Sequence, residues 1–293
     1  MTTPHISQTS ASSPARRFGA VAAVVVGLLT GSAASPAAAY DSEPLDYVAF
    51  GDSYTAGIGA GLPEPSKLQS LANCFQTSAG YVNVLDERDD INLAVNAACA
   101  GWTAGMVPGQ VEAAYAAGYL NTETDLVTIT AGANDVNFIT ALLACLTRSE
   151  VECRTAVNAA EAVATTVVPA ALSQAYGAIQ AKAPNATIAA LGYPHLFAPG
   201  IGDSRYIENV EIFNAGTDTL NKVIRNAAKS SGHVYVDVTD DFEGHGIGSS
   251  EPWINFNPVD PLLGTNFHPN VTGYTEGYAA AVVEEVEIAE LVS

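Results

Sequence analysis

The stretch Tyr47-Val48-Ala49-Phe50-Gly51-Asp52-Ser53-Tyr54-Thr55-Ala56-Gly57 carries the strongest signal in this 293-residue chain. Its first four residues form a short apolar run, which indicates a buried strand. Gly-Asp-Ser follows directly, and a serine at a strand-to-helix turn can present its hydroxyl to solvent beside backbone N–H groups, as a nucleophile requires. Turns are rich in these three residue types, so the motif gains its weight from partners elsewhere in the chain.

Five short apolar runs without polar alternation predict the strands of one sheet. They are Tyr47–Phe50, Ile91–Val95, Leu126–Thr130, Thr187–Leu191 and Val234–Val238. Such runs are typical of parallel strands that are buried on both faces. Longer alanine-rich segments have helical spacing, namely Ala156–Lys182, Asn209–Lys229 and Val271–Leu291. This alternation predicts an α/β protein, a three-layer α/β/α sandwich around a central five-stranded parallel sheet.

Three polar or small residues fall where such a sheet forms its functional site. Ser53 follows the first predicted strand, Gly101 comes shortly after the second, and Asn134 follows the third. Sites in these sheets lie at the carboxyl ends of the strands. A fourth residue, His268, lies in a loop just before the last helical segment, and that loop can bring the imidazole to Ser53.

These residue types suit acyl transfer. A serine hydroxyl is a weak nucleophile that needs a base within hydrogen-bond reach, and histidine serves because its pKa lies near neutrality. Attack on an ester carbonyl creates an oxyanion, which fixed N–H donors stabilise. We therefore predict Ser53 as nucleophile and His268 as base. The predicted oxyanion donors are the backbone N–H groups of Ser53 and Gly101 and the side-chain amide of Asn134.

With these motifs the chain resembles the SGNH, or GDSL-type, hydrolase family. The family's Ser, Gly, Asn and His correspond to Ser53, Gly101, Asn134 and His268, in the family's order. The chain is most similar to the secreted bacterial lipase/esterase branch, which carries Gly-Asp-Ser-Tyr-Thr-Ala-Gly at the serine. Residues 98–103, 192–194 and 242–245 also resemble that branch, so the likeness runs from about Asp46 to about Glu284.

The resemblance implies a flavodoxin-like fold and a secreted serine ester hydrolase, a lipase or carboxylesterase of lipid metabolism that works without a cofactor. Its substrate would be a small-molecule or lipid ester. The family also contains phospholipases and carbohydrate acetyl esterases, and both remain alternatives. A non-catalytic secreted binding module is disfavoured, because binding alone would not need Ser, Gly, Asn and His together.

The group that orients His268 departs from the commonest family pattern. Many members place an aspartate three residues before the histidine, where this chain has Thr265. Some relatives use a backbone carbonyl at that position, so the resemblance implies a Ser53–His268 dyad oriented by the carbonyl of Thr265. The alternative is Asp260, the nearest acidic residue upstream, although Pro261 restricts how its loop folds back.

Four cysteines indicate disulfides in an exported chain, with three possible pairings. Relatives of the resembled branch commonly carry three disulfides, and the first two of these fit Cys74–Cys99 and Cys145–Cys153. No Cys/His cluster has the spacing of a zinc site, so we expect no metal.

The first 39 residues have the pattern of a secretory signal peptide. Arg16 and Arg17 precede a short apolar run, and small residues lead to Ala37-Ala38-Ala39. We therefore expect cleavage after about Ala39, a secreted product, and a single hydrolase domain over residues 40–293. No later stretch has the length and apolarity of a membrane-spanning helix, so we expect no stable membrane insertion.

The net charge of the chain is −20, and because residues 1–39 carry two arginines and no acidic residue, the mature chain would carry −22. A field of this sign repels phosphate backbones. We expect no nucleic-acid partner and a monomeric protein.

Overall fold

The computed structural model describes residues 43–200, 204–260 and 263–291. The expected signal peptide, residues 1–39, lies outside the described residues. The elements in chain order are β1 Leu45–Gly51, β2 Pro63–Pro65, η1 Gln69–Leu71, β3 Phe75–Thr77, α1 Tyr81–Asp86, β4 Ile91–Asn96, η2 Ala104–Met106, α2 Val107–Ala116, β5 Leu126–Thr130, α3 Phe138–Thr147, α4 Glu150–Thr166, α5 Val168–Lys182, β6 Thr187–Leu191, α6 Ser204–Ser230, β7 Val234–Val236, η3 Gly273–Ala279, α7 Ala280–Glu285 and α8 Ile288–Leu291.

The central sheet has five strands in the order β4-β1-β5-β6-β7. Every neighbouring pair is parallel, and all five residues of β5 are buried. Apolar runs without alternation produce this result because both faces of the sheet are covered. The predicted strands and the predicted parallel sheet are confirmed.

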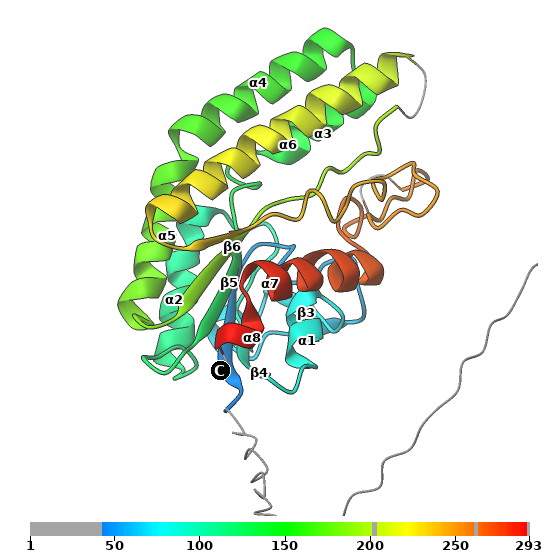
Figure 1. The fold of residues 1–293 in the computed structure, drawn as a ribbon. Coiled ribbons are helices and arrows are strands. Elements are labelled where there is room, and N and C mark those ends of the chain that lie inside the picture. The colour runs from blue at the N-terminus through cyan, green and yellow to red at the C-terminus, as the bar shows by residue number, and fades with distance from the viewer. Residues whose placement is uncertain (1–42, 201–203, 261–262, 292–293) are drawn as a thin grey trace, which may run out of the picture. The chain divides into compact units, whose positions relative to one another are not determined.

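Helices cover the sheet on both faces, which confirms the three-layer sandwich (Figure 1). One layer contains α2, α5 and α6, and the other contains α1, η3 and α7. Helices α3 and α4 pack on α6. The segments that leave the carboxyl ends of β1, β4 and β5 carry the candidate site residues.

The prediction of one helical segment over Ala156–Lys182 is wrong in one respect. The structure has two helices, α4 and α5, that meet at Val167 with a bend of 44°. Pro169 lies in the first turn of α5. Proline lacks a backbone N–H, which is tolerated in the first turn of a helix but would interrupt one continuous helix at this position. Within the described ranges no single helix is long and apolar enough to cross a bilayer, whereas this bent pair meets the criterion by length and composition alone.

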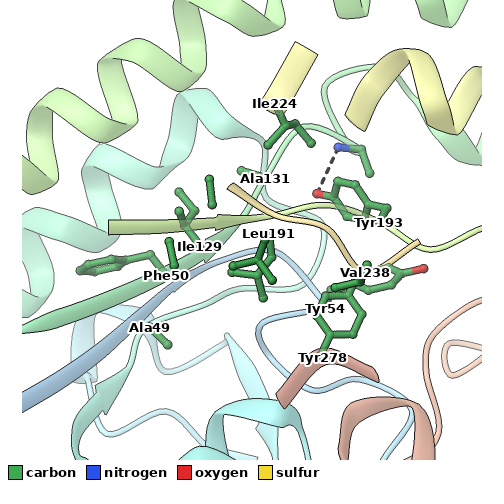
Figure 2. Close-up of a cluster of buried hydrophobic side chains, with 14 of the residues drawn as sticks. Ala49, Phe50, Tyr54, Ile129, Ala131, Leu191, Tyr193, Ile224, Val238 and Tyr278 are labelled. Carbon is green, nitrogen blue, oxygen red and sulfur yellow. Dashed lines mark hydrogen bonds between the residues drawn. The ribbon is translucent and has the colours of Figure 1, made fainter. Parts of the chain in front are cut away.

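Tyrosine side chains extend the aliphatic core toward the carboxyl ends of the strands. Figure 2 shows Tyr54, Tyr193 and Tyr278 gathered beyond the aliphatic residues of the strands. The rings of Tyr54 and Tyr193 meet edge to face, with centroids 5.2 Å apart, a favoured aromatic geometry. All three side chains are buried, so the packed core extends up to the turn that follows β1.

Two disulfides are formed, Cys74–Cys99 and Cys145–Cys153. These are the pairs that the family resemblance implies. The first ties the start of β3 to the loop after β4, two residues before Gly101, and the second ties α3 to α4. A short antiparallel hairpin of β2 and β3, which the sequence did not predict, thus connects covalently to the candidate oxyanion loop.

Candidate active site

Ser53 and His268 lie together although 215 positions separate them in the chain. Ser53 follows β1, and its Oγ lies 2.8 Å from Nε2 of His268. A base within hydrogen-bond reach of a hydroxyl is the geometry that activates a serine nucleophile.

The second ring nitrogen of His268 fixes the tautomer. Nδ1 lies 2.9 Å from the backbone carbonyl oxygen of Asn266. A carbonyl can only accept, so Nδ1 carries the hydrogen and Nε2 has a free lone pair for the Ser53 hydroxyl. The expectation that the carbonyl of Thr265 or the carboxylate of Asp260 orients the ring is thereby corrected to the carbonyl of Asn266.

Local backbone geometry explains the shift by one residue. Phe267 has a left-handed backbone with φ of 63°, and this turn places the carbonyl of Asn266 beside the following imidazole. The Asn266 side chain stabilises the loop, since its Nδ2 donates to the backbone carbonyl of Asp260 at 2.8 Å and its Oδ1 accepts from the N–H of Asn257. Asp260 therefore supports the loop through its backbone.

The histidine loop is tied to the turn that carries the serine. The Tyr54 hydroxyl donates to the carbonyl of Phe267 at 2.7 Å. The backbone N–H of Asn255 donates to the carbonyl of His268, and its Nδ2 donates to the carbonyl of Gly59 at 3.0 Å. These bonds hold the two reacting side chains in register, which preorganises the site.

Burial lowers the pKa of His268 to about 4, against a smaller opposing effect of the hydrogen bond to Asn266. Removal of hydration disfavours the charged imidazolium. At neutral pH the ring is therefore neutral and ready to accept a proton.

Gly101 and Asn134 lie on the neighbouring loops. Gly101 has φ of 80°, and a Cβ at this position would meet open space, so the backbone conformation rather than crowding favours glycine here. The Asn134 amide donates to the carbonyl of Trp102 at 2.9 Å. An amide has two N–H donors, so this bond orients the group beside the Gly101 segment and leaves a second donor.

A buried carboxylate beneath the serine was missed by the sequence analysis as a site component. Asp52 accepts hydrogen bonds from the hydroxyl of Tyr193 at 2.5 Å, from the hydroxyl of Thr130 at 2.8 Å and from the N–H of Tyr54 at 3.0 Å. Burial raises the pKa of Asp52 to about 6. The signals were present, because Asp52 lies in the Gly-Asp-Ser motif and Tyr193 lies in a stretch that carried the family resemblance.

The Tyr193 hydroxyl also accepts the backbone N–H of Ala133 at 3.4 Å, the dashed contact in Figure 2. Ala133 precedes Asn134 directly. A continuous hydrogen-bonded path therefore joins the turn before Ser53 to the segment that carries the candidate oxyanion amide.

Gln110 of α2 is a second residue that the sequence analysis missed. Its buried side chain accepts the N–H of Gly51 at 2.8 Å and donates to the carbonyl of Gly51 at 2.7 Å. Gly51 ends β1 with φ of 130°. This two-fold contact fixes the backbone two residues before Ser53.

Two further histidines lie in other environments. Nε2 of His195 contacts the carboxylate of Asp218 at 2.7 Å, and the ring of His245 stacks on Trp253 at a centroid distance of 3.7 Å. Within the described part of the chain, no group of three or more His, Cys, Asp or Glu side chains is arranged to hold a metal ion.

A hydrogen-bonded serine–histidine pair near the carboxyl ends of a parallel sheet defines the class of serine hydrolases. The sequence matches the model of the GDSL-like Lipase/Acylhydrolase family over residues 49–275. The chain belongs to this family and is a carboxylic ester hydrolase.

Streptomyces lipases are among its relatives. Lipase 1 of Streptomyces coelicolor is 33% identical over 264 residues, which cover 88% of this chain and 91% of the relative. The crystal structure of an extracellular lipase from Streptomyces rimosus superposes with a TM-score of 0.71 at 30% identity, over 82% of this chain and 99% of that one. A phospholipase A1 from Streptomyces albidoflavus superposes with a TM-score of 0.72 at 29% identity, over 82% and 98%.

Proposed function

We propose that the chain is a secreted lipase or esterase that cleaves esters with an apolar acyl chain through an acyl-enzyme on Ser53. The observation that carries this proposal is the 2.8 Å contact between Oγ of Ser53 and Nε2 of His268, together with the acceptor state of Nε2 that the Asn266 carbonyl imposes.

In the first half of the reaction, Nε2 of His268 takes the hydroxyl proton while Oγ of Ser53 attacks the ester carbonyl carbon. The tetrahedral intermediate collapses when the C–O bond to the alcohol breaks, and His268 returns the proton to the leaving alcohol. In the second half, His268 takes a proton from water, the water oxygen attacks the acyl-enzyme, and the proton returns to Ser53 as the carboxylic acid leaves.

The developing oxyanion would accept hydrogen bonds from the backbone N–H groups of Ser53 and Gly101 and from the Asn134 amide. The bond from Asn134 to the Trp102 carbonyl supports this role, because it fixes the amide before substrate arrives. The Asn266 carbonyl orients the imidazole but stabilises imidazolium less than a carboxylate would. Catalysis therefore depends more heavily on the oxyanion donors.

Lipid esters are the favoured substrates because the relatives at about 30% identity are lipases and a phospholipase A1. Phospholipase activity is the second candidate, since the phospholipase superposes as well as the lipase does. The protein would act as a cofactor-free monomer with residues 40–293 as one hydrolase domain, after export and removal of the signal peptide 1–39. It would not bind nucleic acid, and it would not insert stably into a membrane.

Hydrolysis of p-nitrophenyl butyrate by the purified mature protein tests the proposal. We expect turnover by the wild type and loss of nearly all activity in Ser53→Ala and His268→Ala. His195→Ala is the matched control, since that histidine pairs with Asp218 outside the dyad. An inactive wild type, or dyad variants as active as the control while still folded, would contradict the proposal.

A panel of p-nitrophenyl esters of increasing chain length, triglyceride, phosphatidylcholine and acetylated xylan then distinguishes the substrate classes. We expect hydrolysis of the acyl lipids. Activity confined to acetylated xylan would contradict the lipase assignment in favour of a carbohydrate esterase.

A further inference from the structure

Large apolar side chains are exposed on the segments that adjoin the dyad and the candidate oxyanion residues. The exposed fractions of three of them are 91% for Val259, 75% for Leu62 and 57% for Phe75. We define the apolar collar as the six exposed residues Leu62, Phe75, Met106, Ile139, Phe256 and Val259. Single exposed apolar residues are ordinary on a protein surface, so the significance of these six lies in where they occur.

The first side of the collar belongs to the loop that carries His268, in the orange part of Figure 1. The ring of Phe256 packs on the ring of Phe267 with centroids 5.5 Å apart, and Phe267 directly precedes His268. The hydrogen bond from Asn255 to the carbonyl of Gly59 connects this loop to the turn after Ser53.

The next side is the β2–β3 hairpin, which follows that turn. The N–H of Leu62 binds the hydroxyl of Ser78, which closes the base of the hairpin. Phe75 follows Cys74, whose disulfide reaches Cys99 in the loop of Gly101. An exposed phenylalanine is therefore held beside the candidate oxyanion loop.

The last side combines the loops after β4 and β5. The N–H of Ala104 binds the carboxylate of Asp135 at 2.8 Å, so Met106 and Ile139 are carried by two segments that contact one another next to Asn134. Hydrogen bonds and the Cys74–Cys99 disulfide thus connect all the collar segments in one succession, from the loop of His268 to the loop after β5.

The charge of the molecule restricts what the collar can contact. The chain has a net charge of −20, and residues 62–77, 101–106, 134–139 and 255–260 contain a single cation, Lys67. Anionic lipid is bound through clusters of basic residues, and no such cluster occurs on these segments. With a substrate dissolved in water the six side chains would stay exposed to solvent, whereas an apolar phase without net charge would bury them.

We propose that the apolar collar is an interfacial surface that lies on aggregated lipid without net charge and delivers ester molecules to the dyad. This inference rests on the proposed lipid-ester function and specifies the physical form of the substrate. The protein would rest on the lipid through side chains from several loops, with Ser53 facing the aggregate.

Binding to phosphatidylcholine vesicles tests the inference in the Ser53→Ala background, which removes hydrolysis from the measurement. Phe75→Ser with Val259→Ser removes two collar side chains. Val151→Ser with Val167→Ser is the matched control, because these residues are 72% and 53% exposed but lie on α4 and at its junction with α5. Circular dichroism and thermal melts confirm that each variant is folded.

We expect the collar pair to weaken vesicle partitioning by about tenfold per side chain, as loss of a buried Val or Phe would produce, and the control pair to change it less than twofold or so. Vesicles rich in phosphatidylglycerol should bind the parent more weakly at low salt. Equal partitioning of the two pairs, preference for anionic vesicles, or a change of oligomeric state in the collar pair alone would overturn the inference.

Turnover of p-nitrophenyl butyrate by the wild type distinguishes failure of the collar inference from failure of the proposed function. If this soluble ester is hydrolysed but the collar pair binds vesicles like the parent, the collar inference fails and the proposed function stands. If the soluble ester is not hydrolysed, the proposed function fails.

Discussion

His268 differs from a freely hydrated histidine in two respects, of which the first lowers its pKa and the second raises it by a smaller amount. Its burial disfavours the charged form, and its Nδ1 partner is the neutral carbonyl of Asn266. A carboxylate partner would stabilise imidazolium and raise the pKa of the ring. The dyad thus holds an unusually acid-tolerant base.

The first prediction concerns the pH dependence of activity. The pKa of His268 is depressed to about 4, so the neutral base is present above that value and is lost as the pH falls through it. We expect kcat/KM for p-nitrophenyl butyrate to stay nearly constant from about pH 8 to about pH 5 and to fall below. A midpoint near pH 6.5 in a protein that stays folded would contradict the burial argument.

The second prediction follows from the opposite shifts of His268 and Asp52. The unfolded state protonates histidine near pH 6.5, above the native pKa of about 4, so this residue lowers stability as the pH falls through that window. The native pKa of Asp52, about 6, exceeds its unfolded value of 3.8, so Asp52 raises stability as the pH falls between those values. The two effects oppose each other in the wild type.

Asp52→Asn removes the second effect. We expect its Tm to fall more steeply than that of the wild type between about pH 7 and about pH 4.5, measured by calorimetry. His268→Ala is the complementary variant and should show a shallower fall. Parallel curves for all three proteins would show that neither group controls acid stability.

At the scale of elements, the two disulfides close loops of different length. Cys74 and Cys99 are 25 positions apart, whereas Cys145 and Cys153 are 8 apart. Chain entropy gives stabilisations of about 3.5 and about 2.5 kcal/mol for these loops. The longer loop also contains β3, one strand of the hairpin, and leads to Gly101, so its bridge should affect catalysis as well.

The third prediction compares the paired Cys→Ser variants in urea. Removing Cys74–Cys99 should lower the free energy of unfolding by about 1 kcal/mol more than removing Cys145–Cys153. It should also lower kcat for a soluble ester, whereas the second pair should leave kcat near the wild-type value. Equal effects of both pairs on kcat would show that the first bridge does not position the Gly101 loop.

The strands were predictable from the sequence because burial on both faces leaves a simple signal, a short apolar run. The hairpin was not, since Pro63-Glu64-Pro65 is exposed and prolines argue against strands. The division between α4 and α5 could have been inferred from Pro169, but helical periodicity continues on both sides of it. No pattern in the sequence indicates the π-helical run Gly273–Ala279.

The candidate site was likewise predictable from the sequence only in part. Motif order identified Ser53 and His268, whose contact the structure contains. The partner of the imidazole depends on the left-handed backbone of Phe267, a conformation that sequence does not indicate for a bulky residue. Likewise the side chain of Gln110 reaches Gly51 only through the docking of α2, a tertiary contact that no local pattern indicates.

At the scale of the whole molecule, charge is the dominant property. A net charge of −20 makes the folded chain repel itself, because folding brings like charges together. Described ion pairs such as Arg88–Asp90 and Arg154–Glu150 lie at the surface and stabilise little. The repulsion is therefore mostly uncompensated.

The fourth prediction is that salt stabilises the protein. Raising NaCl from about 0.05 M to about 1 M shortens the screening length from over 10 Å to about 3 Å, so the Tm at neutral pH should rise by about 3 °C or more. Potassium chloride serves as a control for specific sodium binding. A Tm that falls or stays constant in both salts would show that self-repulsion is not significant.

The distance along the chain between Ser53 and His268 has a consequence for biosynthesis. The last strand of the sheet ends at Val236, more than thirty positions before His268. A nascent polypeptide emerging from its amino terminus can therefore assemble every sheet strand while its base is still missing. The final segment supplies both the base and the helices η3 and α7 that cover one face of the sheet, so a chain that is still held at the ribosome short of His268 could not hydrolyse the lipids around it.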